Sequence, residues 1–399
     1  MTISAENSDV KTADELYYDP YSVELNMNPY PVFARIRQEA PLYYNDKHDF
    51  YALSRYDDVN KALIDHETFI SGKGALLEII KSGMEIPPGT LIFEDPPLHN
   101  IQRNLLSRMF TPRKVAALEP QIREFTARCL DPLVGTGKFD FVNDLGEQMP
   151  MRVIGMLLGI PEEHQRRVAD HGEATLQGEQ TLMATGEVFA EFLDYRTEHP
   201  SDDIMTELLN VEFTDETGTV RRLRREELLM YLTVVATAGA ETTTRLIGWA
   251  GKTLAENPDQ RRELVENPAL IPQAIEEILR WEPPALQMAR YVARDAEYHG
   301  QTIPEGSAIL LLIGAANRDH RRFPPDGDVF DIHREQHSHL TFGAGTHFCM
   351  GNALARMEGR IALEEILKRF PTWEVDWPNA RPSQTTAVRG WEAMPTFVP

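Results

Sequence analysis

The chain of 399 residues has few cysteines and no long hydrophobic run. Its two cysteines, Cys129 and Cys349, are too few for the disulfide framework of a small secreted protein. No apolar stretch approaches the ~20 residues that a membrane-spanning helix needs. Residues 1–16 are polar and acidic, unlike a signal peptide. We therefore expect a cytoplasmic protein that does not insert into a membrane.

Positive charge is also scarce, since 40 lysines and arginines stand against 62 acids, for a net charge of −22. Nucleic acid would be repelled by such a surface, and we exclude it as a partner. Internal repeats and linkers rich in Gly, Ser or Pro are absent. With 42% hydrophobic residues, the chain can bury a large core. We expect a mobile N-terminal tail, residues 1–19, one domain, residues 20–399, and a monomer.

Helical spacing dominates the domain. Residues 226–256 form one unbroken helical pattern, which at ~1.5 Å per residue predicts a rod of about 46 Å. Further helical patterns cover residues 29–39, 57–64, 98–110, most of 112–209, 272–281 and 352–368. Residues 41–56 alternate like a hairpin, and residues 285–312 and 372–399 alternate strand and turn signals. The predicted class is mainly α, with a minor β region assembled from distant segments.

One uncharged stretch stands out, Phe342-Gly343-Ala344-Gly345-Thr346-His347-Phe348-Cys349-Met350-Gly351. No acid, lysine or arginine occurs between Ser338 and Asn352, although 26% of the chain is charged. Its glycines allow tight backbone turns, and a helical pattern follows at once. The start of a helix favours an anion, and a thiolate is the form of cysteine that binds metals. The alternative is a buried structural cysteine in a glycine-rich turn.

The pattern F-G-x-G-x-H-x-C-x-G resembles the haem-ligand loop of the cytochromes P-450, the haem-thiolate monooxygenases. The resemblance extends from about residue 20 to the C-terminus. It implies haem b (iron protoporphyrin IX) between the long central helix and this loop, with Cys349 as the metal ligand. Phe342, Gly343, His347 and Gly351 would contact the haem. A thiolate ligand on haem iron favours O–O cleavage.

The long helix contains Ala238-Gly239-Ala240-Glu241-Thr242-Thr243, which resembles the family's oxygen-activation motif A-G-x-[DE]-T-T. Glycine inside a helix costs ~1 kcal/mol relative to alanine, so Gly239 needs a reason. Without a side chain there, a flat cofactor can approach Ala238 and Gly239. Thr242 can bond back to a helix carbonyl, and Glu241 supplies an acid beside that alcohol for proton delivery. The alternative explanation is small residues that permit close helix packing.

Buried haem propionates need cations, and four basic residues stand at positions similar to those of the family. They are His99, Arg103, Arg290 and His347. Glu277 and Arg280 form an E-x-x-R pair on one helix face. With Arg334 they resemble the family's structural ion triad beneath the haem loop.

The candidate substrate pocket is apolar. Its predicted residues are Leu76, Leu77, Val235, Ala238, Leu286, Gln287 and Met288. Residues 71–90 are expected to form a binding lid, with a short core helix as the alternative. Residues 162–201 are about one helix shorter than is usual in the family, which would leave the pocket roof open or remodelled. A terpenoid, steroid, fatty acyl or aromatic substrate fits equally well.

Basic residues flank the cysteine loop in sequence. Those expected on the face behind the thiolate are Arg103, Arg108, Arg113, Lys114, Arg356 and Arg360. Such a patch suits an acidic ferredoxin or flavodoxin as electron donor, unless these cations pair internally. Cys129 has no glycine or histidine support and is expected to be structural.

The resemblance implies insertion of one oxygen atom from O2 into a C–H or C=C bond. The electrons would come from NAD(P)H through separate redox proteins. A peroxide-driven peroxygenase of the same fold is an alternative, but family members of that kind lack the acid–threonine pair. Another alternative is a zinc site from His337, His339, His347 and Cys349, whose spacing matches no common zinc pattern.

Overall fold

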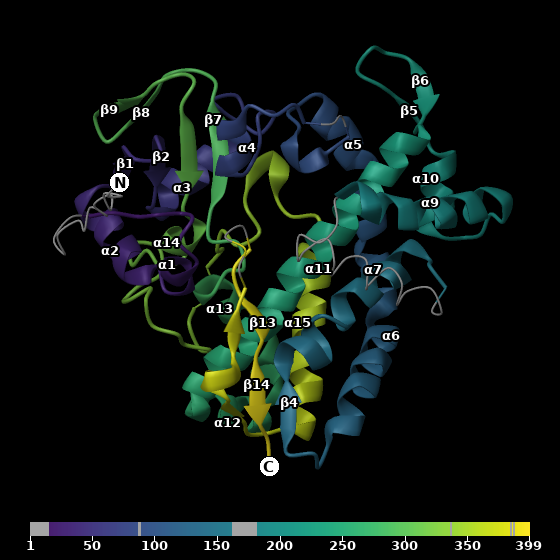
Figure 1. Ribbon diagram of the computed structural model, residues 1–399, viewed down its shortest axis with the longest axis vertical. Helices are drawn as coiled ribbons and strands as arrows, with labels where there is room; N and C mark the ends of the chain where they lie inside the picture. Colours follow the sequence, from purple (N-terminus) through teal and green to yellow (C-terminus); the bar gives the residue numbers. More distant parts are fainter. Residues whose placement is uncertain (1–15, 87–88, 162–181, 336, 384, 386–387) are drawn as a thin grey trace, which may run out of the picture.

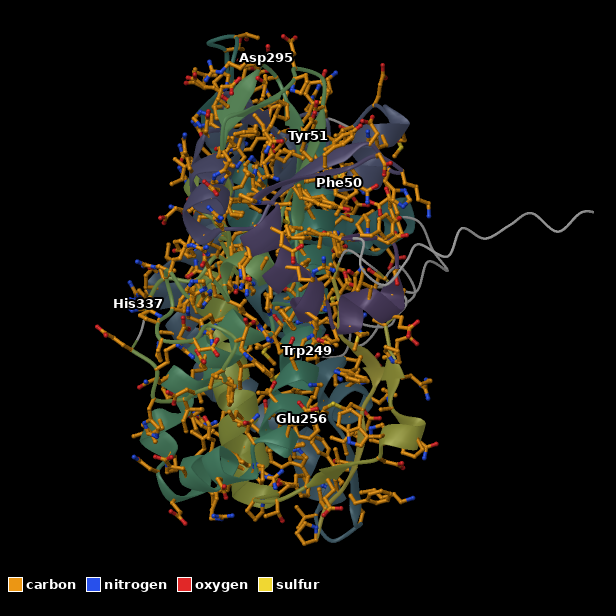
Figure 2. The ribbon with its side chains drawn as sticks, turned by 90° about the vertical axis from the view of Figure 1, so that its left-hand side faces the viewer. Phe50, Tyr51, Trp249, Glu256, Asp295 and His337 are labelled. Carbon is orange, nitrogen blue, oxygen red and sulfur yellow. The ribbon has the colours of Figure 1, made fainter. Side chains whose placement is uncertain are left out.

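A single helix of 32 residues, α11 (Arg225–Glu256), runs through the middle of the molecule (Figure 1). It confirms the unbroken pattern predicted for residues 226–256. Its C-terminal half is buried on all sides, and the Trp249 ring is fully enclosed there (Figure 2). Helices α7 (Met149–Leu158), α9 (Leu182–Glu198), α13 (Ile271–Trp281) and α15 (Asn352–Arg369) pack against it. The rod is therefore the element on which a site in the core can be built.

A computed structural model describes residues 16–86, 89–161, 182–335, 337–383, 385 and 388–399. Residues 1–15 of the expected tail lie outside the described residues. Tyr18, also assigned to that tail, is fully buried. Its hydroxyl donates hydrogen bonds to Asn26 Oδ1 at 3.1 Å and to Gln287 Oε1 at 2.8 Å. The chain is therefore packed onto the domain before residue 20.

Most of the remaining helices follow the predicted patterns, but three of them, over residues 23–27, 258–266 and 313–316, lie where no helix was predicted. Thr111 caps α6 (Pro112–Leu130), which has proline at its first position, and Gly159 ends α7 in the left-handed region. The others are α1 (Val23–Met27), α2 (Tyr30–Glu39), α3 (Tyr56–Ile64), α4 (Leu77–Ser82), α5 (Leu98–Leu106), α10 (Ile204–Asn210), α12 (Pro258–Glu266) and α14 (Ile313–Ala316). Short 3-10 turns include η1 (Leu91–Phe93) and η2 (Ser107–Phe110).

The main sheet has five strands in the order β1-β2-β10-β7-β3. These are β1 (Leu42–Asn45), β2 (Phe50–Leu53), β10 (Ala308–Leu311), β7 (Met288–Val292) and β3 (Phe69–Ile70). The β1–β2 hairpin is antiparallel, as predicted, and β10 joins β2 in parallel. Phe50 and Tyr51 mark this sheet, away from Trp249 and Glu256 of α11 (Figure 2). The mainly α fold with a minor β region of distant segments is thus confirmed.

Four smaller sheets complete the described β structure. Near the C-terminus, β4 (Lys138–Asp140) and β11 (Glu374–Val375) pair with β14 (Pro395–Phe397), and β12 (Arg381–Pro382) pairs with β13 (Trp391–Ala393). The other two are the hairpins β5 (Glu212–Thr214) with β6 (Val220–Arg222), and β8 (Ala296–Tyr298) with β9 (Gln301–Ile303).

The stretch expected to be a lid is a short helix on the sheet instead. Within residues 71–90, α4 contacts β7 and β10, and the Leu77 side chain is buried with Phe50 and Leu310. The backbone N–H of Ala289 donates to the Ala75 carbonyl at 2.9 Å. The alternative prediction, a short core helix, is therefore the one observed.

Half of the shortened stretch 162–201, residues 162–181, lies outside the described residues, and α9 covers most of the other half. The open or remodelled roof therefore stays a prediction. Among the described helices, none combines the length and the apolar character that crossing a bilayer requires.

Candidate active site

The cysteine loop is a tight turn that lies directly before α15. Gly343 and Gly345 have φ angles of 70° and 68°, which side chains disfavour. A Cβ on Gly345 would also lie 2.9 Å from the Leu63 carbonyl oxygen, so only glycine fits between the loop and α3. The backbone N–H of Cys349 donates to the Phe342 carbonyl at 2.8 Å, which closes the turn around the cysteine.

The thiol of Cys349 faces an enclosed environment. Burial raises the pKa of Cys349, while the backbone N–H of Gly351 and the positive charges of Arg103 and Arg356 lower it. A bound metal ion deprotonates a thiol that coordinates it. The site therefore has a neutral thiol that a metal can convert to a thiolate, with two cations at hand to stabilise that charge.

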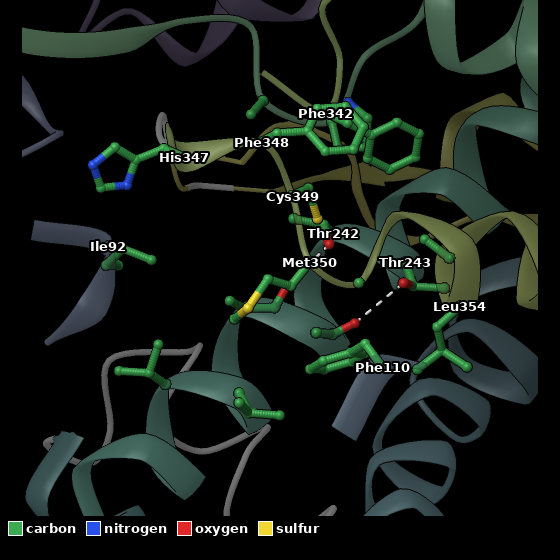
Figure 3. Close-up of a pocket in the computed structure, with 18 of the residues that line it drawn as sticks. Ile92, Phe110, Thr242, Thr243, Phe342, His347, Phe348, Cys349, Met350 and Leu354 are labelled. Carbon is green, nitrogen blue, oxygen red and sulfur yellow. Dashed lines mark hydrogen bonds between the residues drawn. The ribbon is translucent and has the colours of Figure 1, made fainter. Parts of the chain in front are cut away.

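A cavity separates the cysteine loop from the central helix, and Cys349, Met350, Phe342 and Thr242 line it (Figure 3). Its walls are mainly apolar and come from distant elements: Leu91 and Ile92 of η1, Ile154 of α7, and Val234, Val235 and Leu246 of α11. Ala238 lies in the middle of α11, yet its side chain is exposed to this cavity. Ala238, Gly239 and Val235 thus line this cavity, and their contact with haem or substrate stays a prediction.

Small and hydroxyl-bearing residues of α11 line one wall of the cavity, and their contacts explain why these residue types occur in the helix. Thr242 Oγ1 donates to the Ala238 carbonyl at 3.0 Å, as predicted, and Thr243 Oγ1 donates to the Gly239 carbonyl at 3.1 Å (Figure 3). A Cβ on Gly239 would come within 2.8 Å of Ile154 Cδ1. The packing alternative therefore applies to Gly239, which lets α7 approach α11 closely and also lines the cavity.

Glu241 turns away from the cavity that Thr242 lines, because successive helix residues differ by about 100° in direction. Its carboxylate lies 3.7 Å from the Arg245 guanidinium. Burial raises the pKa of Glu241, and Arg245 offsets part of that rise. The acid and the alcohol of the predicted pair are sequence neighbours on different sides of α11.

Four basic groups gather at one edge of the cavity. The rings of His99 and His347 lie 4.2 Å apart between centres, and the Nε2 atom of each is buried without a hydrogen-bond partner. Burial, followed by the charges of His99, Arg290 and Arg103, lowers the pKa of His347 to about 3. Burial likewise lowers the pKa of Arg290 to about 10.

No acid forms an ion pair with any of these four groups among the described residues. Arg103 donates only to the Phe348 carbonyl, and Arg290 to the carbonyl of Ala289. Buried cations without a counter-charge are costly. Two carboxylates at this edge would satisfy both histidines and both arginines, so the residues fit the propionates of the expected haem.

Five predicted pocket residues do not line this cavity in the structure. Leu77 and Leu286 are buried in a separate cluster beneath the sheet, and Gln287 accepts the hydrogen bond from Tyr18. Met288 packs on the other face of the sheet, and Leu76 precedes α4. Leu77, Leu286 and Met288 therefore pack in clusters beside the sheet, and contact of all five residues with a substrate stays a prediction.

The predicted ion triad is present. Arg280 donates to both oxygens of Glu277 at 2.7 Å, and Arg334 Nε donates to Glu277 Oε1 at 3.2 Å. The side chains of all three are at most 9% exposed. This confirms a buried ionic connection between α13 and the segment that leads into the cysteine loop.

Several predicted docking cations are paired internally. Lys114 contacts Glu207 at 2.6 Å, Arg356 contacts Glu276 at 2.6 Å, and Arg360 contacts Glu119 at 2.8 Å. Arg108 and Arg113 are exposed, and neither forms an ion pair with a described residue. The internal-pairing alternative thus applies to three of the cations, and these two arginines keep their charge free.

Sequence reasoning missed Glu358, a buried acid of α15. Its carboxyl is 2% exposed, it contributes to the cavity lining, and Oε2 has no hydrogen-bond partner. Burial raises the pKa of Glu358 well above its usual range. A carboxyl that burial biases toward its protonated form therefore lies beside the cavity, and a glutamate within a helical pattern gave no signal of it.

The predicted zinc ligands do not come together among the described residues, so the zinc alternative is wrong. His339 lies against Glu276, while His347 packs on His99. No cluster of three possible metal ligands from His, Cys, Asp or Glu occurs within the part of the chain that the structure describes.

Known proteins match this chain closely. The family model "Cytochrome P450" (cytochrome P-450) matches residues 139–386. A putative cytochrome P-450 123 of Mycobacterium tuberculosis is 35% identical over 397 residues, covering 96% of this chain and 97% of that protein. A vitamin D(3) 25-hydroxylase of Pseudonocardia autotrophica is 34% identical over 390 residues, covering 95% of this chain and 96% of that protein.

The fold comparison agrees. The structure of cytochrome P-450 CYP109Q5 from Chondromyces apiculatus matches with a TM-score of 0.85 and 32% identity, over 96% of this chain and 98% of that one. The chain therefore belongs to the cytochrome P-450 family and is an oxidoreductase of the haem monooxygenase class.

Proposed function

We propose that the protein binds haem b through Cys349 and inserts one oxygen atom from O2 into a C–H or C=C bond of a small hydrophobic substrate. The electrons come from NAD(P)H through separate redox proteins. One observation carries this proposal: an uncharged thiol loop lines the same apolar cavity as His99, Arg103 and His347, with Arg290 close to His347, and none of the four basic groups forms an ion pair with a described acid. Bound haem supplies the redox centre at which O2 is activated.

The chain's own residues hold the cofactor from several sides. When haem is bound, Cys349 would supply the thiolate ligand, Phe342 would pack against the haem, and Gly343 and Gly351 would let the loop backbone approach it closely. His99, Arg103, Arg290 and His347 would bind the propionates, because they are buried or half-buried basic groups without an ion pair to any described acid. Ala238 and Gly239 leave room along α11 on the opposite side.

Proton delivery is assigned to Thr242 and Glu241. The Thr242 hydroxyl borders the cavity and is held by the Ala238 carbonyl. The raised pKa of Glu241 brings proton exchange closer to neutral pH. Rotation of the Glu241 side chain away from Arg245, or a water between the two residues, would connect the acid to the alcohol.

The substrate is proposed to be hydrophobic because Val234, Val235, Ile92 and Ala238 dominate the cavity walls. A relative is named for hydroxylation of vitamin D(3), which agrees with this class of reaction. We propose that residues 20–399 act as one domain, in a monomeric and cytoplasmic protein whose two cysteines are unpaired. Ligand-induced spin-state shifts would identify compounds that bind.

A carbon-monoxide difference spectrum of the reduced protein tests the proposal directly. We expect a red-shifted Soret band, which is diagnostic of a thiolate ligand on haem iron. Absence of that band in haem-loaded protein would contradict the proposal. Turnover with peroxide alone at the rate seen with O2 and reductant would instead favour a peroxygenase.

Replacing Thr242 with alanine should uncouple O2 consumption from product formation. We expect product per O2 to fall about 100-fold, at the weak end of general acid–base contributions of ~10²–10⁴, because water can enter the vacated space. The two electrons and two protons would then leave with O2 as hydrogen peroxide. Measuring O2, peroxide and product in the same reaction checks this.

Thr242→Ser is the matched control, since it keeps the hydroxyl and should keep most of the coupling. If Thr242→Ala stayed fully coupled, the proton route would have to run through another group.

Reversing the charge of Arg108 or Arg113 should slow reduction by an acidic ferredoxin. These exposed arginines have no ion pair with a described residue, so their charge can act on an approaching partner. We expect a several-fold lower association rate and a weaker dependence on salt. Stopped-flow reduction across a series of ionic strengths measures both.

Arg262→Glu on α12 serves as the control because it changes net charge equally at a distant exposed site. Equal slowing in all three variants would show that net charge, and not a docking face, governs the rate.

A further inference from the structure

Two adjacent glutamates of α13 have different partners. Glu277 binds Arg280 and Arg334 in the buried triad, whereas Glu276 accepts two hydrogen bonds from Arg356 of α15. Arg356 Nε lies 2.6 Å from Glu276 Oε1, and Nη2 lies 3.1 Å from Oε2. This two-point geometry holds the guanidinium plane in one orientation.

Arg356 in turn contacts both ends of the cysteine loop. Its guanidinium lies 4.4 Å from the centre of the Phe342 ring, and Nη1 donates to Asn352 Oδ1 at 2.7 Å. Asn352 Nδ2 donates to the Cys349 carbonyl at 2.7 Å, and the Cys349 N–H donates to the Phe342 carbonyl. Arg356 therefore connects the residue that opens the loop with the residue that follows it.

His339 holds Glu276 from the other side. The His339 Nδ1 atom accepts the backbone N–H of Thr341 at 3.3 Å, so the proton of a neutral ring lies on Nε2. That Nε2 atom is 3.3 Å from Glu276 Oε2. Burial alone would raise the pKa of Glu276, but the hydrogen bonds from His339 and Arg356 lower it to about 2. Glu276 is therefore ionised at neutral pH, and its charge cancels that of Arg356.

We propose that Glu276 is a positioning residue of the thiolate site, which holds Arg356 across the cysteine loop and cancels its positive charge there. This inference rests on the proposed role of Cys349 as haem ligand. Reduction of the iron adds one negative charge beside the thiolate. An Arg356 charge without Glu276 would favour the reduced state, and a Glu276 charge without Arg356 would oppose it.

Spectroelectrochemical titration of the haem-loaded protein tests the direction in which each charge shifts the reduction potential. We expect Glu276→Gln to raise the reduction potential and Arg356→Gln to lower it, each by about tenfold in the reduction equilibrium, which is ~59 mV for a one-electron couple. The double variant should return close to the wild-type potential, because both charges are then absent. Arg356→Lys keeps the positive charge and should change the potential less than Arg356→Gln does.

Glu335→Gln is the control. Glu335 is exposed and borders the same surface depression as Glu276, but it forms no ion pair with Arg356. It should leave the potential unchanged. If the substitutions merely loosened the loop, the reduction potentials of both single variants would shift in the same direction. That result, or no shift in either variant, would overturn this inference and leave the proposed function intact. A wild-type protein without the red-shifted carbon-monoxide band would overturn the proposed function and this inference with it.

Discussion

Cys349→Ser should abolish the red-shifted carbon-monoxide band and lower monooxygenase activity by at least ~100-fold. Mutation of residues that merely support metal ligands costs ~10–100-fold, and loss of the ligand itself should exceed that. The loop around the residue would be retained, because the Cys349 N–H to Phe342 carbonyl bond and the turns at Gly343 and Gly345 do not involve the side chain. Absorption spectra and turnover of the haem-reconstituted variant measure both effects.

The second cysteine provides a matched control. Cys129 is partly buried on α6, where burial raises its pKa to about 11. Cys129→Ser should therefore leave the spectrum and the activity close to those of the wild type. A red-shifted band that survived in Cys349→Ser but disappeared in Cys129→Ser would reassign the ligand and refute the proposed site.

The cysteine loop could be predicted from sequence because its chemistry is local. Six spaced residues define the turn, the ligand and the start of the following helix, so no distant partner is needed. The same holds for α11, whose predicted bounds differ from the observed Arg225–Glu256 by one residue. The ion triad joins residues far apart in sequence, and it was recognised only through the resemblance to a family.

Residues whose role depends on a distant partner could not be predicted. Glu276 and Glu277 are adjacent and chemically equal in the sequence, yet one holds Arg356 and the other the triad. Gly239 had two explanations, and only the position of Ile154 on α7 favours close packing. Leu77 lies on the sheet because β7 and β10, more than two hundred residues later, supply its neighbours.

The sequence also could not show which basic side chains form ion pairs with acids that are distant in the sequence. Arg356 and Arg360 were expected in a docking patch unless they paired internally, and acids on α13 and α6 do lie beside them in the fold. Arg108 and Arg113 have no such acid within the described chain. The sequence gives the sign of the charge on each side chain, and packing decides whether that charge is available to a partner protein.

Arg280→Met should destabilise the protein by about 3–5 kcal/mol, because removal of one member of a buried ion pair leaves the other charge uncompensated. Arg280 donates to Glu277 and to the carbonyls of Asn317, Gly327 and Val329. Methionine restores none of these bonds. Urea unfolding of the haem-loaded protein should show a lower midpoint, and haem should be released more readily, since these carbonyls lie in the segment that leads into the cysteine loop.

An exposed pair tests whether burial causes the effect. Arg35 contacts Glu39 at 2.9 Å on α2, with side chains 40% and 50% exposed, so water already solvates both charges. Arg35→Met should leave the unfolding midpoint unchanged. Arg280→Lys should lie between wild type and Arg280→Met, because lysine keeps the charge but cannot reach Glu277 and three carbonyls with one planar group. A midpoint for Arg280→Met equal to that of Arg35→Met would show that the triad does not stabilise the fold, and that Arg334 alone suffices to neutralise Glu277.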